Sequence, residues 1–241
     1  MITSKQNALI KEIRSLADKK FRDELNLYLI EGTKIVKEAI RASLPIKAIV
    51  GTEKALSLID AVSIKTETVS DDVFKSISSE VTPQGVIAIV EKPNLSLSLP
   101  SGNCLLLDGV SDPANVGAII RTAAASGYND VYLTLECADA YSPKAVRSSM
   151  SGIFRINVYR ADIEQILSVL KLPLVVADMF GESVFTKKIK QRFCLVIGNE
   201  GRGVSQKIKN SAAQTVSIPM ENGVESLNAA VSAGILMYNL K

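Results

Sequence analysis

The chain has 241 residues, of which 47% are hydrophobic, so it can form one large domain or two ordinary ones around a packed core. It contains no histidine, which excludes a Ser-His-Asp triad, a Cys-His pair and any histidine-ligated metal. Catalysis must therefore rest on Asp, Glu, Lys, Arg, Ser, Asn or backbone groups, and we expect no metal site.

The net charge of +3 is distributed unevenly along the chain. Residues 1–47 hold ten Lys or Arg against six Asp or Glu, a balance of +4, so the rest of the chain carries −1. A basic front end is typical of a nucleic-acid-binding surface, although a solvated helix face gives the same pattern.

Cysteine usage favours a cytoplasmic protein. Cys104, Cys137 and Cys194 are widely separated and lie in or beside apolar runs, which predicts buried free thiols. No apolar run is long enough to span a membrane, and the first residues show no signal-peptide pattern, so we expect no membrane partner.

The first third of the chain has the pattern of a compact α/β unit. Residues 4–16 carry the apolar stripe of an amphipathic helix, and a second helix is expected over 34–41. Strands are expected over 27–30, 46–50 and 86–90.

Residues 91–103 break this pattern, because they contain two prolines and three serines and show little periodicity. We interpret the segment as a linker, and the alternative is a surface loop within one domain. The expected division is a front domain over 1–95, a linker over 96–103 and a second domain over 104–241.

The second part alternates apolar runs with helical patterns, which predicts a parallel sheet with helices on both faces. Strands are expected over 104–107, 131–135, 153–158, 174–177, 193–197 and 215–218. Helices are expected over 115–126, 144–150, 163–170, 204–210 and 226–240.

Three polar stretches interrupt these elements, and the first begins the helix at 115–126. Asp112 followed by Pro113 fits a helix N-cap and first turn. Gly117 and Arg121 share a helix face, so the glycine leaves room for a ligand beside the guanidinium. An arginine in such an apolar helix needs a carboxylate or phosphate partner. The alternative is a structural ion pair, with Asn115 as a second capping residue.

The second stretch is a glycine-rich loop after the strand at 193–197. Gly198, Gly201 and Gly203 permit unusual backbone angles and let a ligand lie against the main chain. Their spacing is neither a Walker A loop nor Gly-x-Gly-x-x-Gly, which disfavours an NTPase or a nucleotide-dependent oxidoreductase. The plainest alternative is a tight strand-to-helix connection.

The third stretch starts at Ile218, Pro219 and Met220 and ends in the last predicted helix. Pro219 cannot donate a backbone hydrogen bond, so its neighbours can present main-chain groups to a ligand. Ser226 stands at the expected helix start, where the simplest role of a serine is an N-cap.

Together and in this order, the stretches resemble the three motifs of the SpoU (TrmH-like) class of SPOUT RNA methyltransferases. The matching segments are 115–122, 197–203 and 218–228, and 143–150 also looks similar to that class. The segment Glu31-Gly32-Thr33-Lys34 resembles part of the small L30e-like substrate-binding domain that many members carry. The resemblance therefore covers most of the chain.

The resemblance implies methyl transfer from S-adenosylmethionine to a ribose 2′-hydroxyl in RNA, with no metal. The implied fold is an α/β domain whose C-terminal segment forms a trefoil knot, in a homodimer with the active site at the subunit interface. The cofactor positions that match are Gly198, Ile218 and Leu227, with Met220 beside them.

The resemblance also implies catalytic roles. Arg121 matches the key residue at the 2′-hydroxyl. Because a guanidinium keeps its proton, we interpret it as holding the adjacent phosphate and stabilising the developing alkoxide. Glu200 would orient an arginine, while Asn115, Ser226 and Asn228 would fix the loop and the ribose. RNA contacts would fall mainly to the front domain, at Lys5, Lys11, Arg14, Lys34 and Arg41.

The expected substrate is large-subunit ribosomal RNA. Three alternatives stay open: methylation of tRNA, an RNA-binding protein of the same fold without activity, and, outside this class, a nucleotide-dependent oxidoreductase.

Overall fold

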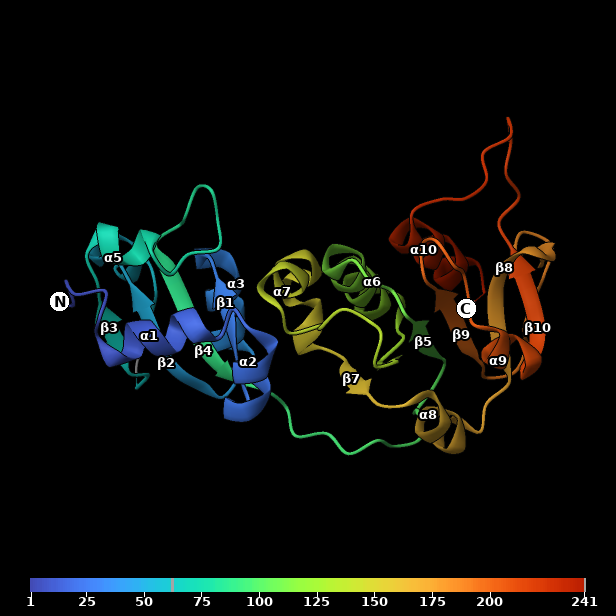
Figure 1. Cartoon of the computed structure of the whole chain (residues 1–241), viewed down its shortest axis with the longest axis horizontal. Helices are drawn as coiled ribbons and strands as arrows, with labels where there is room; N and C mark the ends of the chain where they lie inside the picture. Colours follow the sequence, from blue (N-terminus) through green and yellow to red (C-terminus); the bar gives the residue numbers. More distant parts are fainter. Residues whose placement is uncertain (62, 241) are drawn as a thin grey trace.

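The computed structural model describes residues 1–61 and 63–240 and contains two β-sheets, each with its own helices (Figure 1). The front sheet has the order β1-β4-β2-β3, and only its β2–β3 pair is parallel. The second sheet has the order β10-β8-β9-β5-β6-β7, and every pair in it is parallel. The predicted α/β class and the predicted parallel sheet are both confirmed.

The front part is built from short capped elements. Its helices bury one face each; Ile10 and Ile13 of α1, for example, are fully buried. The helix predicted from residue 4 begins only at Ala8, because the Asn7 side chain caps it by accepting from Leu9 N–H. The elements are α1 (Ala8–Ser15), α2 (Lys19–Leu25), β1 (Leu27–Glu31), α3 (Thr33–Arg41), β2 (Ile46–Gly51), α4 (Glu53–Leu56), β3 (Thr66–Thr68), α5 (Asp71–Lys75) and β4 (Val86–Glu91).

The second part wraps helices around both faces of its sheet, which explains why its central strands are apolar throughout. In β5, Leu105 and Leu107 join one core cluster, whereas Cys104 and Leu106 join the other. The elements are β5 (Cys104–Asp108), α6 (Pro113–Ser126), β6 (Asp130–Leu133), α7 (Pro143–Ser149), the 3₁₀ helix η1 (Met150–Phe154), β7 (Asn157–Arg160), α8 (Ile163–Leu170), β8 (Leu174–Ser183), β9 (Cys194–Gly198), α9 (Gln206–Asn210), β10 (Ala212–Ser217) and α10 (Ala229–Asn239).

The order of the second sheet reverses at β5. The chain continues from β5 to β6 and β7 on one side, whereas β9 lies on the other side. Asp108 and Gly198, the last residues of β5 and β9, are paired in register. The loops that follow these strands therefore leave the same edge of the sheet side by side, at the place where open α/β sheets bind ligands.

The two parts share a core. Tyr28 and Val36 of the front part belong to the same buried cluster as Leu105 and Ile120 of the second part. Residues 92–103, which cross between them, contain no helix or strand, and Tyr132 anchors this segment by donating from its hydroxyl to the Ser98 carbonyl at 2.7 Å. The segment predicted as a linker thus joins two packed bodies.

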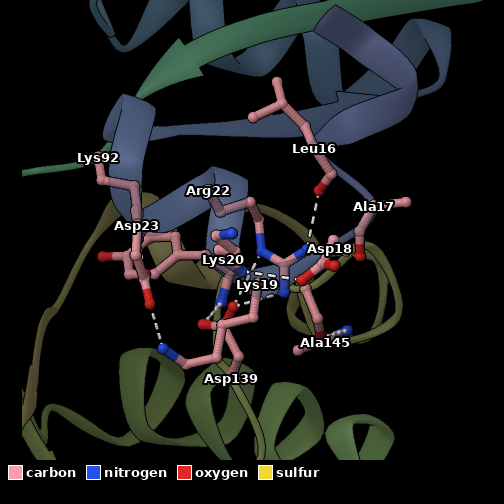
Figure 2. Close-up of polar contacts among 12 residues, drawn as sticks. Leu16, Ala17, Asp18, Lys19, Lys20, Arg22, Asp23, Lys92, Asp139 and Ala145 are labelled. Atoms are coloured by element: carbon pink, nitrogen blue, oxygen red, sulfur yellow. Dashed lines mark hydrogen bonds and ion pairs between the residues drawn. The ribbon is translucent and has the colours of Figure 1, made fainter. Parts of the chain in front are cut away.

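A buried ion pair fixes the junction (Figure 2). Arg22 of α2 is 3% exposed, and its Nη2 and Nε donate to Asp139 Oδ2 at 2.7 and 2.9 Å. Its Nη1 donates to the carbonyl oxygens of Leu16 and Ala17 at 2.8 and 2.7 Å. The rings of Tyr28 and Tyr141 meet beside it, with centroids 5.0 Å apart. Every side-chain nitrogen of this arginine therefore has a partner, as a buried cation requires.

In the second part, the strand expected over 153–158 and the last helix both begin later than predicted. The strand expected over 153–158 is a 3₁₀ turn followed by β7, which begins at Asn157. A Cβ at Gly152 would lie 2.8 Å from Arg121 Cα, so this turn is pressed against α6. The last helix begins at Ala229 instead of 226, because Asn228 caps it by accepting from Ala230 N–H at 2.9 Å. Ser226 is therefore not the N-cap.

The expectation of buried free thiols is confirmed, since Cys104, Cys137 and Cys194 are all free and buried.

Candidate active site

Three of the predicted catalytic residues form one hydrogen-bonded chain. The Asn115 amide donates to Glu200 Oε1 at 2.8 Å, and the Asn228 amide donates to Asn115 Oδ1 at 2.9 Å. Asn115 is 8% exposed and lies in the first turn of α6. Its partners are 85 and 113 residues away in the sequence. The three polar stretches therefore meet at one place, and Asn115 links them instead of capping α6.

Glu200 also binds the loop that precedes α6. The main-chain N–H and the hydroxyl of Ser111 approach Glu200 Oε2 at 3.3 and 3.2 Å. Burial opposes the charge of Glu200, but hydrogen bonds from Asn115 and from neighbouring backbone N–H groups outweigh it, so the pKa of this carboxyl lies below its ordinary value. The expectation that Glu200 orients an arginine is not met within the described chain, because its partners are Asn115 and Ser111.

The glycine loop closes tightly on the end of β9. Asn199 and Gly203 exchange main-chain hydrogen bonds of 3.1 and 2.9 Å, and Asn199 Oδ1 accepts from two further N–H groups of the loop. The Asn199 amide donates to the Gly109 carbonyl at 2.7 Å, which ties the loop to the one after β5. A Cβ at Gly198 would lie 2.3 Å from Gly203, so only glycine permits this approach.

Sequence reasoning missed Asn199, although an asparagine directly after a strand and before glycines is a known turn signal. It also missed Asp108, whose carboxylate accepts from Ser205 N–H at 2.7 Å and holds the far end of the glycine loop. Both residues hold the glycine loop in its shape.

Arg121 lies two turns along α6 from the network, and its side chain is exposed. It forms no side-chain hydrogen bond or ion pair within 1–61 and 63–240, so the alternative of a structural ion pair was wrong. The expected role of Gly117 was also wrong. A Cβ there would lie 2.2 Å from the Ala145 carbonyl oxygen, so Gly117 makes room for α7 and not for a ligand.

The predicted cofactor residues lie at and beyond the ends of β9 and β10. Gly198 and Ile218 are half-buried, and Met220 and Leu227 are each 36% exposed. Among the described residues, no main-chain hydrogen bond forms at Ile218 or Leu227, so their backbone groups are available to a ligand. Ser226 is exposed in the same segment and stands outside the Asn115 network.

The predicted RNA-binding residues are all exposed, but they stand apart from this network. Lys11 and Arg14 lie on α1, Lys34 and Arg41 lie on α3, and Lys5 precedes α1. Nearer to the network, Lys144 of α7 contacts Asp112 Oδ1 at 2.8 Å, at the start of α6. Sequence reasoning had given Lys144 no separate role.

Within the described ranges, no three Asp, Glu or Cys side chains gather in a way that could hold a metal ion. None of the helices built from these residues has the length and apolar character needed to cross a membrane.

Comparison with known proteins shows which family carries these three stretches. The profile described as the SpoU rRNA Methylase family matches residues 102–238, the part that carries all three polar stretches. The chain belongs to this family. A second profile, the MRM3-like substrate binding domain, matches residues 7–88.

Relatives within the SpoU family match along the whole chain. The 23S rRNA guanosine 2′-O-methyltransferase RlmP of Bacillus subtilis is 33% identical, over 100% of this chain and 98% of its own. The AdoMet-bound rRNA methyltransferase of Sinorhizobium meliloti superposes with a TM-score of 0.87 at 30% identity, covering 99% of this chain and 95% of that one. The SpoU methyltransferase AviRb of Streptomyces viridochromogenes, in complex with AdoMet, superposes with a TM-score of 0.85 at 27% identity, covering 97% of each chain.

Proposed function

We propose that this protein transfers a methyl group from S-adenosylmethionine to a ribose 2′-hydroxyl of large-subunit ribosomal RNA. The observation that carries the proposal is the Glu200–Asn115–Asn228 chain, which joins all three family motifs in one site. The named activity of RlmP, which matches this chain end to end, supports the same substrate class.

The residues at the sheet edge suit S-adenosylmethionine. Ile218 and Leu227 offer unpaired main-chain groups for the polar edge of an adenine, and Met220 offers apolar surface for its face. Gly198 brings the main chain of the glycine loop to the same edge. Two solved relatives bind this cofactor. When bound, it supplies an electrophilic methyl group, so the reaction needs a positioned nucleophile and no metal.

The chain's own residues would position and activate that nucleophile. Arg121 is exposed and uncommitted, so it can hold the phosphate next to the target ribose and stabilise the developing alkoxide. Glu200, Asn115 and Asn228 hold the loops around the target, and Ser226 faces solvent where the ribose would enter. The proton leaves to phosphate or water, since a guanidinium does not accept it.

A homodimer would complete the site. Helices α6 and α10 pack together, and they leave an exposed strip that includes Arg121 and the 51% exposed Val231. A second copy on this strip would bury the apolar surface and give Arg121 the enclosed setting that electrostatic catalysis requires. The C-terminal trefoil knot implied by the family resemblance is part of this proposal.

The two domains would have different roles. Residues 1–95 would bind RNA through Lys5, Lys11, Arg14, Lys34 and Arg41, residues 96–103 would link the domains, and residues 104–241 would carry the reaction. The match of residues 7–88 to a substrate-binding profile supports this division. The cytoplasm, where ribosomes are assembled, is the proposed location.

The test is transfer of tritium from labelled S-adenosylmethionine to total RNA from a strain that lacks this gene. The labelled RNA is sized and digested to nucleosides. Label in 2′-O-methylnucleosides of large ribosomal RNA supports the proposal, and label in tRNA contradicts the substrate. Cofactor binding without transfer to free RNA, followed by transfer to ribosomal precursor particles, supports the reaction on an assembly intermediate. Absence of both binding and transfer favours an RNA-binding protein without activity.

A further inference from the structure

A groove of about 210 Å³ lies between the two domains, away from the Asn115 network. On one side it is lined by α1 and by the segment after α5, and on the other side by α7. Of the predicted site residues, only Arg14 lines this groove, as one of the expected RNA contacts.

The floor of the groove is apolar. Ile13, Ile77 and Val146 line it and are buried, and the half-buried Leu29 completes it. An apolar lining of this kind suits the face of a nucleobase, and RNA presents such a face only where a nucleotide is unpaired.

The wall formed by the front domain is polar and held in place. The Glu31 carboxylate accepts from the Ser79 N–H and hydroxyl, each at 3.0 Å, and from the Ser78 hydroxyl. These hydrogen bonds hold the Glu31 carboxylate in the wall and fix the segment after α5. Arg14 stands exposed at the rim and donates to Ser76 Oγ at 3.2 Å, so its guanidinium keeps donors for an anion.

An ion pair between Arg147 and Glu80 crosses the rim from one domain to the other. Their side chains are 46% and 32% exposed, and exposed pairs of this kind are weak. A phosphate can replace Glu80, because it matches the guanidinium with two parallel hydrogen bonds. In the free protein Glu80 therefore competes with RNA for Arg147.

Helix α7 connects the groove to the candidate active site. Lys144 lies one turn before Arg147 and contacts Asp112, the N-cap of α6, at 2.8 Å. An RNA strand that passes from the groove to Asn115 would meet Arg147 first and Lys144 next. The groove is also preformed, because Arg22 binds both Asp139 and the carbonyl of Ala17, which lines the groove (Figure 2).

We propose that this groove binds an unpaired nucleotide of the RNA substrate, outside the candidate active site. The base lies on the apolar floor, and Arg14 and Arg147 hold its phosphate after Glu80 has been displaced. The inference rests on the proposed function and adds a second RNA subsite to it.

The decisive test uses two variants with opposite expected effects on RNA affinity. Glu80→Gln removes the competing carboxylate and should tighten binding of an unmodified large-subunit rRNA transcript by about two- to fivefold, the ratio that corresponds to one exposed ion pair. Arg14→Ala should weaken binding and lower the slope of log affinity against log salt by about 0.7, the value for one phosphate contact of a single strand.

Glu67→Gln is the matched control for the change in net charge. Glu67 is paired with Lys65 in the same domain, has a similar exposure of 37% and does not line the groove. If Glu67→Gln tightens RNA binding as much as Glu80→Gln, the effect is general electrostatics and the groove is not the site. If Glu80→Gln weakens RNA binding, the ion pair only stabilises the contact between the domains, and the proposal is wrong.

A second measurement locates the RNA directly. All three native cysteines are buried, so Ala17→Cys gives one accessible thiol at the groove for a photoreactive label. We expect RNA cross-links at an unpaired nucleotide, and no cross-links from Lys65→Cys. Cross-links confined to paired nucleotides, or equal yields from both positions, would overturn the proposal. Methyl transfer by the wild-type protein is measured separately. If the wild type is inactive, the proposed function is wrong. If the wild type is active but the groove variants bind RNA with unchanged affinity, only the proposed subsite is wrong.

Discussion

The substitution Asn115→Ala removes the residue that joins the three motifs. The alanine would leave Glu200 Oε1 and the Asn228 amide without the partners that they have at 2.8 and 2.9 Å. The side chain is small and sits in the first turn of α6, so the helix itself should persist.

The expected cost follows from the two lost hydrogen bonds. A bond to a charged group contributes about 1.5–3 kcal/mol and a neutral one about 0.5–1.5 kcal/mol. Glu200 and Asn228 are both exposed, and water can replace part of each bond, so the low ends apply. The free energy of unfolding should therefore fall by about 2 kcal/mol, or roughly 4–8 °C in Tm for a chain of this size.

The affinity for S-adenosylmethionine should fall because the same two hydrogen bonds are lost. If the network holds the cofactor loops together, a loss of about 2 kcal/mol corresponds to roughly 30-fold weaker binding of S-adenosylmethionine. The assays are thermal unfolding by circular dichroism and cofactor binding by isothermal titration. Ser111→Ala is the matched control, because it removes only a 3.2 Å bond to the same carboxylate and should have a much smaller effect.

Two results would refute this reasoning. If Asn115→Ala lowers Tm as expected but binds the cofactor as tightly as the wild type, the network stabilises the fold without shaping the site. If neither quantity changes, the two hydrogen bonds contribute nothing measurable.

Four further predictions follow from single side chains. Arg121→Ala should abolish methyl transfer and keep cofactor affinity, measured by equilibrium dialysis; lost cofactor binding would contradict its proposed role. Gly117→Ala would press a Cβ to 2.2 Å from a carbonyl oxygen of α7 and should cost about 1–3 kcal/mol in urea unfolding, whereas Gly102→Ala, which meets nothing within 4 Å, should be neutral. The lowered pKa of Glu200 gives stability that is present above the ordinary value of 4.5 and is lost as pH falls through the lowered pKa. In Glu200→Gln, the free energy of unfolding should therefore fall less steeply with decreasing pH below about 4.5 than in the wild type. An unchanged dependence on pH would contradict this prediction. Arg22→Ala leaves the Asp139 carboxylate, whose side chain is 12% exposed, without its cationic partner and should cost about 3 kcal/mol in the same unfolding assay; a loss below about 1 kcal/mol would show that the junction does not depend on it.

The sequence predicted the second sheet well, because its signal is local. A strand buried on both faces must be apolar at every position, as at Cys104–Asp108 and Cys194–Gly198, and these two strands were placed correctly to within a residue. Capping was predicted less well. Asp112 caps α6 as expected, but the cap of α10 is Asn228 and not Ser226, because both side chains suit this role and the rest of the fold selects one of them.

The local sequence pattern could not predict contacts between residues that are far apart in the chain. Nothing near Arg22 shows that it is buried, since its partner Asp139 lies 117 residues away, across the domain junction. Gly117 suggested space for a ligand, but the neighbouring helix fills that space.

The alternation of apolar runs with helical patterns predicted the α/β class, the absence of histidine limited the available chemistry, and the order of the motifs identified the three segments that form the candidate site. Only the tertiary structure decided which side chains of those segments touch. The reversal of strand order at β5 sets the loops after Asp108 and Gly198 side by side, and the position of α10 against α6 brings Asn228 to Asn115. Hydrogen bonds depend on distances of about 3 Å between atoms, and such distances between residues far apart in sequence are fixed by packing and not by the local sequence pattern.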